Sequence, residues 1–223
     1  MEAAPEAQTL FEPRILERAT LYDVAKRAFD VLVGGIALLI LLPIIAVLSA
    51  IIRLDTPGPA IFRQQRVGQG GRMFTFYKFR TMYVDAKERF PQLYAYRYTD
   101  EEWKNLFYKI PEDPRLTPFG RRLRKTTLDE LPNLFNVVRG DMSLVGPRPE
   151  LPEYARYYSR DQLQKFSVRS GVTGLAQVSG RGWLPVQEQI EADVQYVGRR
   201  CFLFDFWIIL RTIKMVVLRV GAF

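Results

Sequence analysis

The chain has 223 residues, a formal net charge of +8, a 48% hydrophobic composition and no histidine. Missing histidine excludes Ser-His-Asp and Cys-His catalysis, and a single cysteine, Cys201, excludes an internal disulfide and a cysteine-based zinc site. Catalysis therefore falls to carboxylates, Lys, Arg, Tyr, Ser or Thr, and the basic balance predicts an anionic partner such as nucleic acid, anionic lipid or phosphorylated substrate.

The N-terminal quarter contains a membrane candidate. Residues 1–20 are polar and rich in Glu and Ala, which predicts a flexible arm. Residues 21–54 form the predicted membrane element, because residues 31–52 carry no charge and are long enough to span a bilayer as a helix.

Two features oppose a simple transmembrane helix. Pro43 lies inside the apolar run and predicts a kink or break. Basic residues flank both ends, so the positive-inside rule gives no clear orientation. Both features fit a helical hairpin that enters and leaves by one face, but the residues alone leave a Pro-kinked spanning helix equally open.

The next segment predicts a cytosolic domain over residues 55–201. Strand-like alternation at 60–67 and 73–80, joined by a Gly-rich turn at 68–72, predicts a β-hairpin with several basic side chains. Helices are predicted at 84–108, 129–138, 152–166 and 186–197, and a loop at 169–181 contains a short strand at 175–178. Gly140 is the expected stop of the second helix.

The C-terminal residues 202–223 predict an amphipathic helix. Arg211, Lys214 and Arg219 fall on one helical face, opposite a broad apolar face. This pattern is typical of a helix lying in the headgroup plane, and a core helix with a solvated basic edge gives the same pattern. The apolar segment earlier in the chain favours the interfacial interpretation.

Two adjacent carboxylates, Asp129 and Glu130, follow the basic run 121–125. Taken alone they are best read as structural, because Thr127 to Glu130 matches a capping box and acids are common in a first helical turn. The same place is also suited to phosphate chemistry. Asp129 could act as a nucleophile on phosphorus, Glu130 could hold Mg²⁺, and Arg148, between two prolines, could clamp a phosphate.

Five motifs in a fixed order carry a family resemblance. They are Lys78-Phe79-Arg80-Thr81-Met82, Leu128-Asp129-Glu130-Leu131-Pro132, Leu134-Phe135-Asn136-Val137, Gly140-Asp141-Met142-Ser143-Leu144-Val145-Gly146-Pro147-Arg148-Pro149 and Gly171-Val172-Thr173-Gly174-Leu175-Ala176-Gln177-Val178-Ser179-Gly180-Arg181. Together they resemble the bacterial sugar transferase family, the small monotopic polyprenyl-phosphate phosphoglycosyl transferases. The likeness covers about residues 26–217.

The resemblance implies a reaction and a cofactor. Such enzymes transfer a phospho-sugar from a UDP-sugar to a membrane polyprenyl phosphate, here expected to be undecaprenyl phosphate, and release UMP. The resemblance implies Mg²⁺ bound by Glu130 and a covalent phospho-sugar on Asp129. This would be the first membrane step of glycoconjugate or exopolysaccharide assembly.

The resemblance also implies positions for the remaining site residues and the membrane element. The substrate- and phosphate-binding candidates are basic: Lys78, Arg80, Arg148 and Arg181, with Arg169 added from the same loop. The membrane element becomes a re-entrant helix broken at Pro43. The expected fold is α+β and mostly helical, with this helix, a small β-hairpin and amphipathic interfacial helices around a membrane-surface active site.

The implied location is the bacterial inner membrane, with a monotopic anchor and a catalytic domain on the cytoplasmic face. The expected partners are UDP-sugar, polyprenyl phosphate and membrane lipid, with no nucleic acid. The oligomeric state, a homo-oligomer included, stays open, as does the sugar. Ser170 and Leu175 stand where the family usually has Pro and Trp.

Two other functions are compatible with parts of the sequence. A membrane-anchored, non-catalytic module could bind anionic lipid or nucleic acid through its basic face. An ordinary glycosyltransferase could move a sugar without its phosphate, but no Asp-x-Asp metal motif occurs in the chain. Of the three, the ordered motifs favour the phosphoglycosyl transferase.

Overall fold

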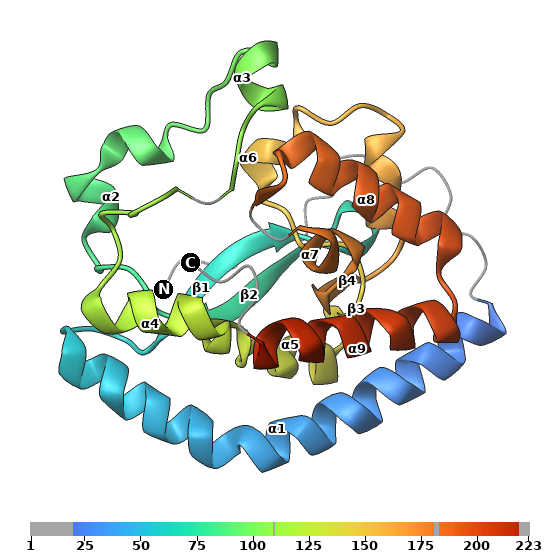
Figure 1. Ribbon diagram of the computed structural model, residues 1–223, viewed down its shortest axis with the longest axis horizontal. Coiled ribbons are helices and arrows are strands. Elements are labelled where there is room, and N and C mark those ends of the chain that lie inside the picture. Colours follow the sequence, from blue (N-terminus) through green and yellow to red (C-terminus); the bar gives the residue numbers. More distant parts are fainter. Residues whose placement is uncertain (1–19, 109, 181–182, 219–223) are drawn as a thin grey trace.

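The computed structural model describes residues 20–108, 110–180 and 183–218, and the predicted arm at residues 1–19 lies outside them (Figure 1). The chain is mostly helical with two small sheets, which confirms the α+β expectation. Its elements are, in order, α1 (Leu21–Asp55), β1 (Ile61–Val67), β2 (Met73–Phe79), α2 (Ala86–Arg89), α3 (Asp100–Lys104), α4 (Pro118–Thr126), α5 (Asn133–Arg139), β3 (Met142–Val145), α6 (Pro152–Ala155), β4 (Ser170–Thr173), α7 (Leu175–Ser179), α8 (Val186–Arg199) and α9 (Phe202–Val217).

Helix α1 is one continuous helix of 35 residues. It begins at a capping box, in which Thr20 and Asp23 each bond the other's backbone N–H. Pro43 lies inside it, so the expected break is wrong: a proline removes one helical hydrogen bond, and the helix continues past it as a bend. Figure 1 shows α1 curved like a bow, with both ends rising toward the rest of the domain.

The two sheets are each two-stranded. β1 and β2 form the predicted antiparallel hairpin, in the register Ile61↔Phe79 to Val67↔Met73. β3 and β4 pair in parallel, which the sequence did not predict. The close approach of the β3 and β4 ends needs glycine, because a Cβ on Gly171 would lie 2.1 Å from the amide nitrogen of Gly146.

Three other predicted elements are wrong in length or type. Residues 84–108 contain only α2, a 3-10 turn at Pro91–Tyr94 and α3, because packing of aromatic side chains on the domain replaces regular helix there. The predicted helix 152–166 is α6 followed by a separate 3-10 turn, Gln162–Ser167. The predicted strand 175–178 is helix α7, and the strand lies just before it as β4. The predicted helix 186–197 is confirmed as α8.

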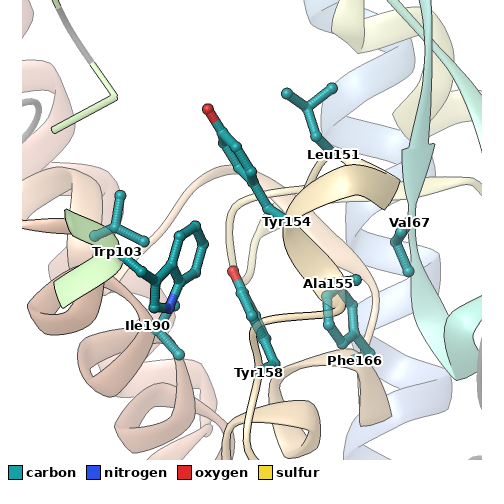
Figure 2. Close-up of a cluster of buried hydrophobic side chains, with 9 residues drawn as sticks. Val67, Trp103, Leu151, Tyr154, Ala155, Tyr158, Phe166 and Ile190 are labelled. Atoms are coloured by element: carbon teal, nitrogen blue, oxygen red, sulfur yellow. The ribbon is translucent and has the colours of Figure 1, made fainter. Parts of the chain in front are cut away.

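The largest core cluster explains how residues 84–108 are held. Figure 2 shows Trp103 of α3 facing Tyr154 and Tyr158 on one side and Ile190 of α8 on the other. The Trp103 ring also stacks on Tyr157, with centroids 4.8 Å apart. Such aromatic contacts bury large areas and add to the stability that burial alone gives. The segment is therefore packed onto the domain at α3.

One side of the molecule is apolar and exposed. Helix α1 is long and apolar enough, by length and composition, to cross a membrane, and only 6% of its most apolar window is buried. Helix α9 lies beside the start of α1, where Lys26 pairs with Asp205 and Tyr22 packs on Phe202 (Figure 1). It too exposes large apolar side chains, among them Leu203 (84%) and Phe206 (58%). Exposed apolar area on this scale is that of a membrane-associated protein.

Candidate active site at the Asp129–Glu130 pair

The carboxylate pair lies in a tight reversal between two helices. Helix α4 ends at Thr126, and Thr127 then takes a left-handed conformation with φ of 61°. Asp129 and Glu130 follow in a 3-10 turn, Leu128–Glu130, and α5 begins only at Asn133. Thr127 makes no side-chain cap, so the predicted capping box is wrong. A left-handed threonine is strained, and such strain is often found at functional sites.

Basic side chains surround the pair. Lys78, Arg66, Arg124 and Arg148 are close enough for their charges to act on one another, and Asp129 attracts both Lys78 and Arg124. Asp129 is buried, with 9% exposed, whereas Glu130 keeps 24% of its side chain exposed and lies 3.8 Å from Arg148 Nη1. Four cations around two carboxylates leave a surplus of positive charge, which suits a bound diphosphate.

Lys78 has an unusual charge state. Burial and the repulsion of Arg124 lower its pKa to about 7, against the attraction of Asp129. Its ammonium also lies 5.5 Å from the centre of the Phe62 ring. A lysine with this pKa is only partly charged near neutral pH, and an arriving anion would favour its charged form.

The segment that carries Arg148 is firmly mounted. Pro147 and Pro149 have no N–H, so Arg148 supplies the one backbone donor of the three residues. This N–H donates to Asp193 Oδ2 at 3.2 Å. The carbonyl of Pro147 accepts from the N–H of Gly171 at 2.8 Å, and that of Pro149 accepts from Arg66 at 3.3 Å. Fixing the backbone in this way limits where the guanidinium can point.

A buried charged network lies behind this mount. Lys165 is 2% exposed, and its Nζ lies 2.8 Å from Asp193 Oδ2 and 3.7 Å from Glu150 Oε2. Glu150 also accepts from the hydroxyls of Tyr158, at 2.6 Å, and Tyr108. The Tyr108 ring lies 5.9 Å from the Arg148 guanidinium. The network therefore contacts Arg148 through both its backbone and its side chain.

Three predicted site residues lie elsewhere or outside the described chain. Arg80 is 5% exposed, and its guanidinium donates to the carbonyls of Ile52, Thr56 and Pro57 at the end of α1, so it caps that helix and does not face the carboxylates. Arg169 donates to the carbonyl of Gly140 at 3.2 Å, at the end of α5. Arg181 lies outside the described residues.

The donor set fits a hard divalent cation such as Mg²⁺. Asp129 and Glu130 offer carboxylate oxygens, which Mg²⁺ prefers, together with substrate phosphates and water. Across residues 20–108, 110–180 and 183–218 no three His, Cys, Asp or Glu side chains gather as a closed metal cage. A metal here would therefore draw most of its ligands from substrate and solvent, with Glu130 as the protein ligand.

Three residues near the pair were missed as site residues by the sequence analysis: Arg66, Arg124 and Tyr108. For Arg66 a signal was present, because the hairpin register puts it on the same face as Lys78. Arg124 belonged to a basic run in which helical spacing alone could not show which member faces the pair. Tyr108 reaches the site through a tertiary contact that has no local signal.

Comparisons with known proteins show the family of the chain. The family described as bacterial sugar transferase matches residues 21–219, and the chain belongs to this family. It is 43% identical over 201 residues to the galactosyl transferase CpsE of Streptococcus agalactiae, covering 89% of this chain and 43% of that protein.

Two further relatives differ in length. The undecaprenyl-phosphate galactose phosphotransferase of Salmonella typhimurium is 41% identical over 199 residues, covering 89% of this chain and 41% of that protein. The exopolysaccharide production protein ExoY of Rhizobium meliloti is 36% identical over 205 residues, covering 90% of this chain and 88% of that protein. The chain thus spans about two fifths of the first two relatives and most of ExoY.

Proposed function

We propose that the chain transfers a sugar 1-phosphate from a UDP-sugar to a membrane polyprenyl phosphate, such as undecaprenyl phosphate. The observation that carries this proposal is the buried Asp129 beside Glu130 within a ring of four cations. The name of the Salmonella relative describes a phosphotransferase acting on undecaprenyl phosphate, which supports the same lipid acceptor here.

The first chemical step uses Asp129 as the nucleophile. Its carboxylate oxygen attacks the sugar-bearing phosphorus, the bond from that phosphorus to the bridging oxygen breaks, and UMP leaves with that oxygen and its electron pair. The product is a phospho-sugar joined to Asp129 as an acyl phosphate. Lys78, Arg66, Arg124 and Arg148 stabilise the charge that develops on the phosphate oxygens.

The second step restores the enzyme. A phosphate oxygen of the polyprenyl phosphate attacks the same phosphorus, and the bond to Asp129 breaks, which returns the carboxylate and forms polyprenyl-diphosphate-sugar. A dianionic phosphate needs no base to activate it, which is consistent with a chain that has no histidine. Glu130, together with substrate phosphates, would hold Mg²⁺, which would supply further charge neutralisation.

The membrane anchor in this proposal is re-entrant, on the cytoplasmic side of the bacterial inner membrane. Near its start, Arg27 of α1 donates to the carbonyls of Val137 and Val138, and Asp30 accepts from the N–H of Leu144. At the other end of α1, the Arg80 guanidinium donates to the carbonyls of Ile52 and Thr56. A straight spanning helix would place its two ends on opposite sides of the bilayer, whereas one domain holds both ends here.

The identity of the nucleotide product tests the proposed reaction. Purified protein, undecaprenyl phosphate, Mg²⁺ and a panel of UDP-sugars are incubated, and the nucleotides are separated by chromatography. Phospho-sugar transfer releases UMP, whereas transfer of the sugar alone releases UDP. Release of UDP in place of UMP contradicts the proposal, as does the absence of any lipid-dependent product with every donor.

Nucleotide affinity is expected to fall as the pH rises from 7.5 to 9. Lys78, with a pKa of about 7 in the free protein, must regain its proton to pair with a phosphate, so each pH unit lowers affinity by up to about tenfold. UMP is a suitable probe, because its phosphate already carries both charges above its second pKa of about 6. Calorimetry in two buffers of different ionisation enthalpy measures the proton uptake directly.

The variant Lys78→Met should bind UMP more weakly and without this proton uptake. The exposed Lys87, which lies on α2, gives a matched control, and Lys87→Met should keep both the affinity and the uptake. Equal proton uptake by Lys78→Met and the wild-type protein would show that another group titrates.

A further inference from the structure

A small polar pocket opens beside the reacting carboxylates. Its polar lining residues are Glu130, Arg148, Asn133, Gln177 and Arg66. These residues come from separate elements, namely the turn before α5, α5 itself, α7, β1 and the segment after β3. The pocket has room for about one water-sized group. It can therefore admit a single functional group of a ligand that lies over Glu130 and Arg148.

Three atoms of this lining are buried without a hydrogen-bond partner among the described residues. They are Asn133 Oδ1, Gln177 Oε1 and Arg66 Nε. Asn133 is 1% exposed as a whole, and it is the first residue of α5, three positions after Glu130. Folded proteins pair nearly all their buried polar atoms, so a cluster of unpaired ones in one pocket indicates a missing partner.

The chemistry of the three atoms restricts that partner. Two carboxamide oxygens are acceptors and the guanidinium N–H is a donor, so the partner must both donate and accept. A phosphate oxygen has no proton to donate, and an apolar group would leave all three atoms unpaired. A hydroxyl group does both and is about the size of the water that would otherwise fill the pocket.

We propose that this pocket receives one hydroxyl group of the donor nucleotide-sugar, from either its sugar or its ribose, and that Asn133 and Gln177 recognise it. This inference rests on the proposed function. The hydroxyl displaces a water molecule, donates its one proton to a carboxamide oxygen of Asn133 or Gln177 and accepts from Arg66 Nε, while Arg148 binds the diphosphate next to it. Asn133 and Gln177 thereby select donors that carry a hydroxyl at the matching position.

A cycle that combines enzyme variants with donor variants tests this. UMP release is measured as kcat/KM for the preferred UDP-sugar, its monodeoxy analogues and the analogue with 2′-deoxyribose, all with undecaprenyl phosphate. For one analogue the wild-type protein should lose about tenfold, the value of one well-made hydrogen bond. Asn133→Leu or Gln177→Met should lose little between the same two donors, because the partner of that hydroxyl is already gone.

Each result has a definite meaning. Coupling to a sugar hydroxyl or to the ribose hydroxyl supports the pocket and identifies the source. If the variants still release UMP and lose the same factor in kcat/KM as the wild-type protein for every missing hydroxyl, the pocket holds a structural water. That result overturns this inference but not the proposed function. No UMP release by the wild-type protein overturns the proposed function, and the inference with it.

The controls separate recognition from folding. Gln189→Met removes a carboxamide that is also buried, at 6% exposed, and that donates to the carbonyl of Leu184 instead of lining the pocket. It should lower stability and leave every donor ratio unchanged. Gln177 is only half-buried, so Gln177→Met tests the pocket even if Asn133→Leu does not fold.

Discussion

Asp129→Asn is expected to lower the rate of sugar phosphate transfer by at least about a thousandfold, since an amide cannot form the acyl phosphate. Without lipid acceptor, the wild-type protein should gain the mass of a phospho-sugar when it is given its UDP-sugar and Mg²⁺, and release one UMP per chain. The variant should show neither. Intact-protein mass spectrometry and nucleotide chromatography measure the two products in one sample.

The structure supplies a matched control for this experiment. Asp161→Asn makes the same chemical change at an exposed aspartate in the loop before the 3-10 turn Gln162–Ser167. It should keep both the adduct and the rate. Persistence of the adduct in Asp129→Asn would move the nucleophile to another residue, while loss of the adduct with full turnover would favour direct transfer between donor and acceptor.

The parts of the fold that could be predicted depend on local pattern. Alternation and a Gly-rich turn predicted the β1–β2 hairpin, and Gly140, with φ of 104°, ends α5 as expected. The carboxylate pair was found because no histidine competes for the chemistry and because the ordered motifs resemble a known family. The hairpin and the helix stop are signals of local sequence, whereas the missing histidine and the order of the motifs are properties of the whole chain.

The parts that failed depend on contacts between distant residues. Nothing in the local sequence distinguishes Arg80 from a cation of the site. Its position beyond the end of β2 nevertheless takes its side chain to the last turn of α1 instead of the site. The segment 84–108 has helix-like composition, but Trp103 anchors it through contacts with α6 and α8. Lys165 resembles a surface lysine in sequence, and its buried position depends on Asp193 and Glu150, which are both distant in the chain.

The buried position of Lys165 leads to the largest expected effect on stability. Lys165→Met leaves Asp193 and Glu150 buried without their cation, and breaking such a pair destabilises a protein by about 3–5 kcal/mol. We expect the free energy of unfolding, measured by denaturant titration in detergent micelles, to fall by that amount. A loss below about 1 kcal/mol would show that the network contributes little.

The double variant Lys165→Met/Asp193→Asn tests the reason for this loss. It removes one charge of each sign, and the asparagine oxygen can still accept from the N–H of Arg148. It should recover at least about half of the lost stability and keep the KM for the UDP-sugar near the wild-type value, because the mount of Arg148 is preserved. Recovery of stability with a raised KM would show that the charge of Asp193, and not only its oxygen, positions Arg148.

The pH dependence of the single variant gives an independent check on the same network. Burial already raises the pKa of Asp193, and without Lys165 only the hydrogen bond from the Arg148 N–H opposes that shift. The folded variant then binds more protons than the unfolded chain above about pH 4, so its stability rises as the pH is lowered from 8 to 5. The double variant lacks the titrating carboxyl at position 193 and should show a smaller rise. Equal pH dependence in the two variants would place the unpaired charge on Glu150 instead.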